Sequence, residues 1–405
     1  MTESPDAVVA RVFRDERLAV LATLIRQVGD VQLAEDALQD AFAAAVEAWR
    51  RDGVPDRAGA WITVAARRRA IDRLRRDRSI AERAERLARL MRLEDGRPDA
   101  GAVDDDRLRL IFTCCHPALA MPARVALTLR MVGGLTTAEI ARAFLVAEPT
   151  MGKRIVRAKR RIAEAGVGYR VPGRDELPER LRGVLRVVYL IFNEGYSAAE
   201  GDRLVRGELC GEAVRLGRLL AELLPGETEV WGLLALMLLH DARRPARVDA
   251  DGHYVALHEQ DRSLWDRDEI REGLAALARA KGPGEYRLQA AIAALHMAAP
   301  EPDWTLIARL YGTLGEISPA PVVEVNRAVA VGFADGPGAG LALLAPLLDE
   351  PVLERYQPLH AAHAELLRRA GDVDGAEGAY RRALEITGNE VERAELARRL
   401  QTLRG

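Results

Sequence analysis

The chain has 405 residues, a length that predicts two or three domains. Apolar residues make up 49% and charged residues 30%, a balance that excludes a disordered chain. Residues 1–170 hold 31 basic and 24 acidic residues (net +7), and residues 171–405 hold 28 and 37 (net −9), so we expect the first part to meet nucleic acid.

Helix-forming residues dominate the chain, and aromatic residues contribute only 5%. This composition predicts an all-α protein. The three cysteines are odd in number, which argues against a disulfide framework and favours a reducing compartment. The N-terminal sequence has no apolar signal core, and the longest apolar stretch, Trp231–Leu239, is too short to span a bilayer. We therefore expect a cytoplasmic protein with no membrane partner.

The first 78 residues read as helices joined by one loop. Asp30 is placed to cap a helix that continues to Arg50. Gly and Pro break the chain in the loop Arg51–Gly59, and a second helix is predicted over residues 60–78. The first of these helices has one apolar face, formed by Leu33, Ala37, Leu38, Ala41, Phe42, Ala45 and Trp49.

A second helical unit is predicted after the acidic, Gly- and Pro-containing stretch 92–106, which we interpret as a linker. Within residues 136–161, Thr136 or Thr137 is placed to cap a short helix. A brief turn follows, and Glu148 and Pro149 open a second, strongly basic helix. This order predicts a helix-turn-helix whose second helix enters the major groove of DNA.

In that geometry Glu148, Thr150 and Lys153 face base edges, whereas Arg157, Lys159 and Arg160 contact phosphates. The alternative interpretation is an ordinary solvated basic helix face.

The order of these segments resembles the extracytoplasmic-function class of sigma factors in the sigma-70 family. Residues 30–49 resemble the polymerase-binding helix of region two, residues 61–75 the helix that melts and reads the minus-ten element, and residues 107–163 region four, which reads the minus-thirty-five element. The chain differs at Arg68, where members of this class often have Asn. The loop Arg51–Gly59 is then expected to hold a flipped base.

The resemblance implies three groups of site residues. The helix that docks on core RNA polymerase contributes Glu35, Asp36, Gln39, Asp40, Phe42 and Trp49. The minus-ten element is contacted by Trp61, Arg67, Arg68, Arg69, Asp72, Arg73, Arg75 and Arg76. The minus-thirty-five element is contacted by Thr137, Glu148, Thr150, Lys153, Arg154, Arg157, Lys159 and Arg160.

The C-terminal part reads as helix after helix, with a degenerate offset of 37 residues between residues 326–344 and 363–380 that suggests tetratricopeptide-like hairpins. Two motifs, residues 190–196 and 260–266, resemble those of the sigma-factor subgroup with such an extension, and the resemblance implies a regulatory role. They predict either a groove for a protein, peptide or small molecule or a buried hydrogen-bonded core. The groove residues are Asn193, Glu194, Tyr196, Gln260, Asp261, Arg262 and Trp265. For Asn193 and Glu194 we favour a structural role at a helix end, with Gly195 as its left-handed residue.

No catalytic or cofactor motif is found, so we expect neither an enzyme nor a cofactor. Cys114 and Cys115 read as buried structural thiols, and the histidines show no metal-ligand spacing beside a carboxylate pair. The expected domains are 1–91, 107–168 and 172–405, with the linker 92–106. The leading hypothesis is a promoter-specificity subunit tuned by its C-terminal domain. The alternatives are a free-standing helix-turn-helix regulator, and a C-terminal half with its own ligand-sensing function.

Overall fold

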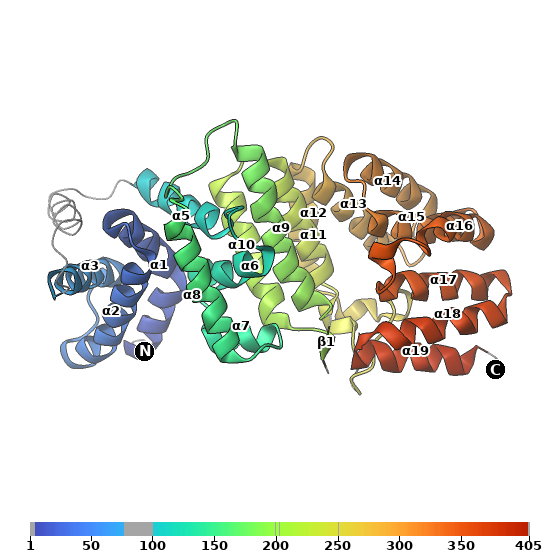
Figure 1. Cartoon of the computed structure of the whole chain (residues 1–405), viewed down its shortest axis with the longest axis horizontal. Helices are drawn as coiled ribbons and strands as arrows, with labels where there is room; N and C mark the ends of the chain where they lie inside the picture. Colours follow the sequence, from blue (N-terminus) through green and yellow to red (C-terminus); the bar gives the residue numbers. More distant parts are fainter. Residues whose placement is uncertain (1–4, 77–99, 199, 202, 250, 404–405) are drawn as a thin grey trace. The chain divides into compact units, whose positions relative to one another are not determined.

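The structure is a computed structural model that describes residues 5–76, 100–198, 200–201, 203–249 and 251–403 (Figure 1). The chain forms two compact units, Met1–Val187 and Val188–Gly405. Helix α9, Leu177–Tyr196, crosses the boundary between them. The described residues are almost entirely helical, which confirms the all-α prediction.

The first unit begins with three helices, α1 (Pro5–Val28), α2 (Val31–Asp52) and α3 (Ala58–Arg76), that pack against one another. The side chain of Asp30 accepts a hydrogen bond from the amide of Leu33, so the predicted cap of α2 is confirmed. The predicted apolar face of α2 is buried, except for the half-buried Leu33, because its residues recur on one side of the helix.

The rest of the first unit consists of α5 (Ala100–Cys114), α6 (Met121–Thr128), a π-helical turn at Leu129–Gly133, α7 (Thr137–Ala143) and α8 (Glu148–Glu164). Residues 100–106, the end of the stretch interpreted as a linker, belong to α5. Asp106 explains this difference, because its carboxylate is fully buried and binds Arg26 and Arg109. Residues 92–99 of that stretch lie outside the described residues.

The second unit is a succession of helices in which each contacts the next from α10 to α19. The helices are α10 (Gly207–Leu223), α11 (Thr228–Asp241), α12 (Arg267–Arg279), α13 (Glu285–Ala298), α14 (Trp304–Ile317), α15 (Pro321–Ala334), α16 (Pro337–Leu344), α17 (Gln357–Ala370), α18 (Val373–Ile386) and α19 (Glu390–Thr402). The apolar stretch Trp231–Leu239 lies in α11, which is buried on nearly all sides by its neighbours. Among the described helices, none has both the length and the apolar character that a membrane span needs.

The beginning and end of the second unit are joined. Strand β1 (Glu200–Gly201) pairs in parallel with β2 (Gly388–Asn389). Asn389 is fully buried and donates to the carbonyls of Ala198 and Arg203 at 3.0 and 3.1 Å. Its side-chain oxygen also caps α19, so one side chain satisfies groups from both ends of the unit.

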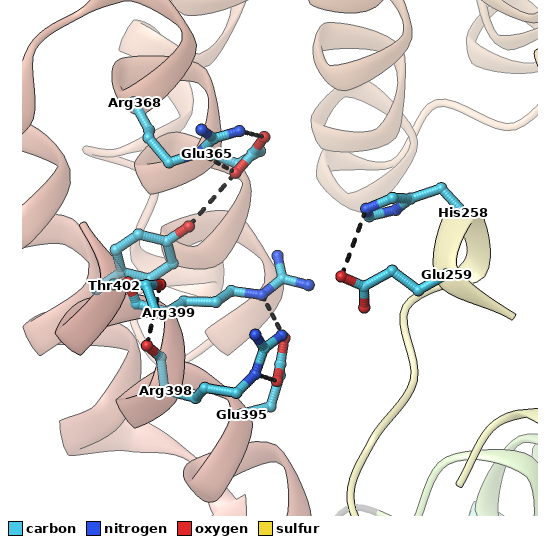
Figure 2. A network of polar contacts seen from close by, with 9 residues as sticks. His258, Glu259, Glu365, Arg368, Glu395, Arg398, Arg399 and Thr402 are labelled. Atoms are coloured by element: carbon cyan, nitrogen blue, oxygen red, sulfur yellow. Dashed lines mark hydrogen bonds and ion pairs between the residues drawn. The ribbon is translucent and has the colours of Figure 1, made fainter. Parts of the chain in front are cut away.

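Polar contacts between charged side chains lie on the last three helices (Figure 2). Glu395 of α19 binds Arg398 and Arg399 on the following turn at 2.7 and 2.6 Å. Glu365 of α17 binds Arg368 and accepts a hydrogen bond from Tyr380 of α18. The Tyr380–Glu365 hydrogen bond therefore links α18 to α17, whereas the Glu395 ion pairs lie within α19.

The motif at residues 190–196 differs from its prediction. Helix α9 continues through it to Tyr196, and Gly195 has no positive φ. A Cβ atom on Gly195 would lie 2.7 Å from the amide nitrogen of Cys210. The glycine therefore allows α10 to approach α9 closely, and it does not terminate the helix.

Candidate nucleic-acid interface

The acidic face of α2 lies against the basic helix α3. Arg73 binds Asp36 at 2.8 Å and Asp40 at 2.7 Å. These three residues were predicted for two different surfaces, polymerase binding and minus-ten DNA binding, and the structure brings them together. Gln39 is exposed beside them, so the outer surface of α2 still carries polar groups.

Glu35 occupies a different position from its neighbours on α2. Its residue exposure is only 3%, and its carboxylate binds both Lys159 of α8 and Arg130 of the π-helical turn. Burial alone would raise the pKa of Glu35, but Lys159 and then Arg130 outweigh it, and the pKa stays below its usual value. Glu35 and Lys159 were predicted to face the polymerase and DNA phosphates, and here they face each other.

Phe42 and Trp49 are core residues of the first unit. Phe42 packs edge-on against Phe13, with ring centroids 5.0 Å apart, and Trp49 packs edge-on against Trp61 at 5.6 Å. Trp49 is 2% exposed, so it supports the shape of α2 and offers little surface to a partner. Trp61 is only partly buried and stays accessible at the start of α3.

The arginine-rich part of α3 keeps an accessible basic side. Arg68 and Asp72 are exposed, and Arg67 and Arg69 are half-buried. Arg75 and Arg76 belong to the helix, but their side chains lie outside the described residues.

A cavity of about 630 Å³ lies where the loop before α3 meets α1. Val54 to Ala60 form one wall, and Val8, Arg11, Val12 and Glu16 of α1 form the other. The carboxylate of Glu16 fills the space over Gly59, where a Cβ atom would overlap it. The loop predicted to receive a flipped base thus borders a hollow with both charged and apolar walls.

The helix-turn-helix forms as predicted. Thr136 and Glu139 make a reciprocal capping box at the start of α7, and Leu145 turns the chain with a positive φ of 49°. Pro149 stands in the first turn of α8, where its missing amide hydrogen costs nothing. Met151, Ile155, Ala158 and Ile162 are the buried residues of α8.

The outward side of α8 is basic. Glu148, Thr150, Lys153, Arg157 and Arg160 are exposed, Arg154 is half-buried, and Thr137 of α7 is half-buried beside this side. A hollow of about 420 Å³ separates α8 from Leu119 and Ala120, and its basic wall consists of Lys153, Arg154, Arg157 and Arg161. Such a cluster suits a phosphate group.

The two C-terminal motifs meet around a pair of arginines. Arg243 donates to the hydroxyl of Tyr196 at 3.0 Å, and Arg247 stacks on the Tyr196 ring at 3.8 Å and donates to its carbonyl oxygen. The backbone of Arg247 also binds that of Val255, whose carbonyl accepts from Gln260. Tyr196 and Gln260 are therefore linked through Arg247.

The other groove residues mostly have internal roles. Glu194 binds Arg206, and Asp261 caps a short 3-10 turn. Arg262 stacks on Trp265 at 4.7 Å and caps α13 through the carbonyls of His296 and Met297. Asn193 is exposed. Within the described residues, three buried polar atoms here have no hydrogen-bond partner: Gln260 Oε1, Trp265 Nε1 and His296 Nδ1.

The cysteines were expected to be buried structural thiols, and the histidines were expected to lie away from carboxylate pairs. Cys114 and Cys115 are buried free thiols, and burial raises the pKa of Cys115 to about 11, which confirms the structural reading. His253 does lie beside two carboxylates, Asp249 and Asp251, contrary to the sequence interpretation. All three are exposed, and Asp249 accepts the amides of Asp251 and His253, which explains the cluster as a turn.

Several residues of these sites escaped the sequence analysis. Arg130 and Arg17 bind across long stretches of sequence, and Glu16, Arg243 and Arg247 have no motif around them. Of these residues, only Arg130 could have been singled out from the sequence, because it is a charged residue in the largely apolar stretch from Val125 to Val132. A charge in a buried run predicts a distant partner without identifying it.

Comparisons with known proteins agree with this geometry. Residues 12–80 match the family Sigma-70 region 2, residues 109–162 match Sigma-70, region 4, and residues 180–281 match a family of unknown function, DUF6596. An uncharacterized protein of Rhizobium meliloti, R00370, is 42% identical over 400 residues, covering 96% of this chain and 94% of the relative. A probable ECF RNA polymerase sigma factor SigI of Mycobacterium tuberculosis is 28% identical over 204 residues, covering 49% of this chain and 66% of the relative. No solved structure matches the chain.

A helix-turn-helix with a basic outer face, preceded by a separate basic helix, defines a DNA-binding protein of transcription. The chain belongs to the sigma-70 family, in the extracytoplasmic-function class, and it carries a C-terminal extension.

Proposed function

We propose that this protein is a promoter-specificity subunit that binds core RNA polymerase in the cytoplasm and directs transcription initiation. The observation that carries the proposal is the presence, in one chain, of the polar helix pair α2–α3 and the basic helix α8, in the order of the two sigma regions. RNA polymerase supplies the chemistry, so the protein itself acts without a catalytic residue or a cofactor.

Each proposed surface binds a different partner. The exposed end of the α2 face around Gln39 and Asp40 docks on the polymerase, and the α3 arginines with the 630 Å³ cavity hold the single-stranded minus-ten element. Lys153 and Thr150 read the minus-thirty-five element, and Arg157 contacts phosphate.

In vitro transcription tests this function. Core polymerase and the full chain are incubated with fragments of the protein's own genome, and another sigma factor shows that core is active. We expect specific transcripts. Absence of transcripts together with failure to bind core at low salt would overturn the proposal. Tight duplex binding without core would instead favour a free-standing regulator.

Variants of α8 test the assignment of its exposed face. Lys153→Ala should cost about 1–3 kcal/mol in promoter affinity and relax the preference at one base pair. Arg157→Ala should weaken binding to all sequences and reduce the salt slope by about 1. Glu179→Gln, at an exposed position of α9 outside the helix-turn-helix, is the control and should leave both properties unchanged.

We propose that the extension tunes this activity through its helical, tetratricopeptide-like domain. The unsatisfied buried atoms of Gln260, Trp265 and His296 support a bound regulatory ligand or peptide, since buried polar groups normally have partners. Transcription by the full chain is compared with that by residues 1–187. More transcript from the shortened chain identifies an inhibitory extension, and less identifies an activating one. Equal transcript from both would exclude tuning.

A further inference from the structure

Two buried arginines of the second unit bind only uncharged groups. Arg243 and Arg247, each 7% exposed, flank the 3-10 turn Arg244–Ala246 that follows α11. Arg243 contacts the hydroxyl of Tyr196 at 3.0 Å and Nδ1 of His240 at 2.8 Å. Arg247 stacks on the Tyr196 ring and donates to the carbonyl of the same residue. Within the described residues, neither guanidinium forms an ion pair with a carboxylate.

The titratable groups nearby do not supply the missing negative charge. Burial, followed by Arg243, lowers the pKa of His296 to about 4 and that of His240 well below its usual value, so both rings are neutral at pH 7. Glu392 interacts with Arg247, but burial raises the pKa of Glu392, and the two described side chains form no ion pair.

A buried guanidinium cannot remove its own charge. A buried lysine or histidine becomes neutral when its pKa shifts, whereas arginine stays protonated in proteins. Buried charges are therefore normally paired, as Arg206 of the same unit is with Glu194. Arg247 at least caps the C-terminal end of α9 through the Tyr196 carbonyl. Arg243 has no such compensation, so an anion from outside the chain would be its natural partner.

Three buried polar atoms that lack a hydrogen-bond partner among the described residues show what else the ligand must carry. Gln260 and Trp265 are 9% and 5% exposed, and their unpartnered atoms are Oε1 and Nε1. The third atom is Nδ1 of His296. The indole N–H requires an acceptor, and the amide oxygen requires a donor. A carboxylate with an N–H group beside it offers both.

The segments that hold these atoms are joined to the arginine turn. The amide of Asp266 donates to the carbonyl of Ala242 at 2.9 Å. The amide of Val255 donates to the carbonyl of Arg247 at 2.9 Å, and Gln260 donates to the carbonyl of Val255 at 3.2 Å. The unpartnered atoms and the two arginines therefore border one buried region.

A row of aromatic side chains continues from His296 toward the surface. Trp304 packs edge-on against His296, with ring centroids 5.3 Å apart, and stacks on Phe333 at 4.4 Å. Both rings are half-buried, and the exposed Arg369 stacks on Phe333 at 3.9 Å. The row places apolar surface beside the buried region, where the body of a ligand would lie.

We propose that this region binds a small carboxylic acid with an N–H group beside its carboxylate and an apolar body, and that Arg243 holds the carboxylate. The inference deepens the ligand site of the extension, and it rests on the proposed function only for the process that the ligand regulates. Binding itself is a property of the free chain.

Titration of the full chain with N-acetyl-L-phenylalanine tests the site, because this probe has the carboxylate, the N–H group and an apolar ring. The indole N–H signals of the five tryptophans are followed by NMR, and Trp265→Phe identifies the signal of Trp265. We expect that signal to shift until saturation, while the signal of Trp49 in the first unit stays in place. N-acetyl-L-phenylalaninamide, which has no charge, should bind at least about tenfold more weakly.

Variants test the role of Arg243. Arg243→Met removes the charge at similar volume and should abolish the shift. Arg243→Lys keeps the charge without the planar fork and should weaken binding about tenfold, and it is the second variant if Arg243→Met does not fold. Arg279→Met is the matched control, because Arg279 also stacks on an aromatic ring, that of Trp231, but is exposed. It should leave the shift unchanged.

A tetrapeptide that ends in phenylalanine separates a free acid from the end of a chain. We expect it to bind more weakly than the probe, because a longer chain would have to enter a buried region. Tighter binding by the tetrapeptide would overturn the assignment to a small acid.

Absence of a saturable shift, equal affinity for the acid and its amide, or unchanged binding by a folded Arg243 variant would overturn the site. Core binding and transcription are measured on the same protein. If the probe binds as expected but core is not bound and no transcripts form, the proposed function fails and the site stands. If transcripts form but the probe causes no shift, the site fails and the function stands.

Discussion

Arginine supplies the buried cations among the described residues of this protein (Arg17, Arg206, Arg243 and Arg247), and three of them show different uses. Arg17 donates to backbone carbonyls, Arg206 pairs with Glu194, and Arg247 stacks on an aromatic ring. The planar guanidinium suits all three, because it offers five donors in fixed directions and an exposed flat face. Lysine would reproduce the charge at these positions without the geometry.

Arg247→Lys tests this difference. The substitution removes the stacking on Tyr196 at 3.8 Å and should lower the free energy of unfolding of the second unit by about 1–2 kcal/mol. Chemical denaturation followed by circular dichroism measures the change. Arg279→Lys is the control, because Arg279 stacks on Trp231 at 4.3 Å but is exposed. Equal decreases in the free energy of unfolding for both variants would show that the stacking on Tyr196 stabilises the fold no more than the exposed stacking on Trp231.

Glu269 makes the free energy of unfolding of the second unit depend on pH. Burial, helped by Asp241, raises its pKa from 4.5 to about 7. The folded state therefore holds a proton that the unfolded chain has lost between these values, and the free energy of unfolding falls as the pH rises through this window. Glu269→Gln should flatten the profile and stabilise the unit at pH 8 by less than about 1 kcal/mol, since the group is partly exposed.

A neighbour on the same helix behaves oppositely. Glu272 binds Arg218 at 2.7 Å, which holds the pKa of Glu272 below its usual value. Its stabilising contribution is present above pH 4.5 and is lost as the pH falls. Glu272→Gln should therefore lower stability slightly at pH 8, where Glu269→Gln raises it. Thermal unfolding at pH 5 and pH 8 separates the two, and equal profiles for both variants would contradict the assignment.

At the scale of elements, close helix packing in the second unit depends on glycine. Gly332 of α15 and Gly340 of α16 lie opposite each other. A Cβ atom on Gly340 would be 2.7 Å from the carbonyl oxygen of Ala328 and 2.8 Å from the Cα atom of Gly332. Backbone atoms cannot move aside as a flexible side chain does, so the two helices would have to separate.

Gly340→Ala should therefore lower the free energy of unfolding by about 1–3 kcal/mol. Gly338→Ala is the matched control on the same helix, because nothing lies within 4 Å of its Cβ position. We expect it to be neutral or slightly stabilising, since alanine favours the helix. Differential scanning calorimetry measures both, and a neutral Gly340→Ala would show that the helices separate at no cost.

At the scale of the whole molecule, α9 belongs to both units. Its first half packs on the first unit, where Arg180 donates to the carbonyl of Phe112 at 2.8 Å. Its second half carries Phe192 and Tyr196 of the second unit. A shortened chain that ends before α9 therefore removes part of the first unit as well as the extension.

A chain of residues 1–171 should accordingly melt at least about 2 °C lower than a chain of residues 1–187, as the loss of about 1 kcal/mol or more predicts for a domain of this size. Thermal unfolding followed by circular dichroism measures both. Equal melting temperatures would show that α9 contributes nothing to the first unit. Transcription by 1–187 is for this reason the cleaner test of the extension.

The sequence by itself determined the helical class, the order of the two sigma regions and the local helix signals. Asp30, Thr136 and Pro149 have the capping or first-turn positions that were predicted for them, because these signals act within one or two turns of the chain.

The tertiary structure alone decided which charged residues form pairs. Glu35 and Lys159 are 124 residues apart, and their pairing depends on how α2 and α8 pack. Likewise, the role of Gly195 was set by the approach of α10 and not by its own preference for a left-handed turn. Periodicity and capping report what a helix buries and where it begins, but the partner of a buried charge is chosen by packing between distant helices.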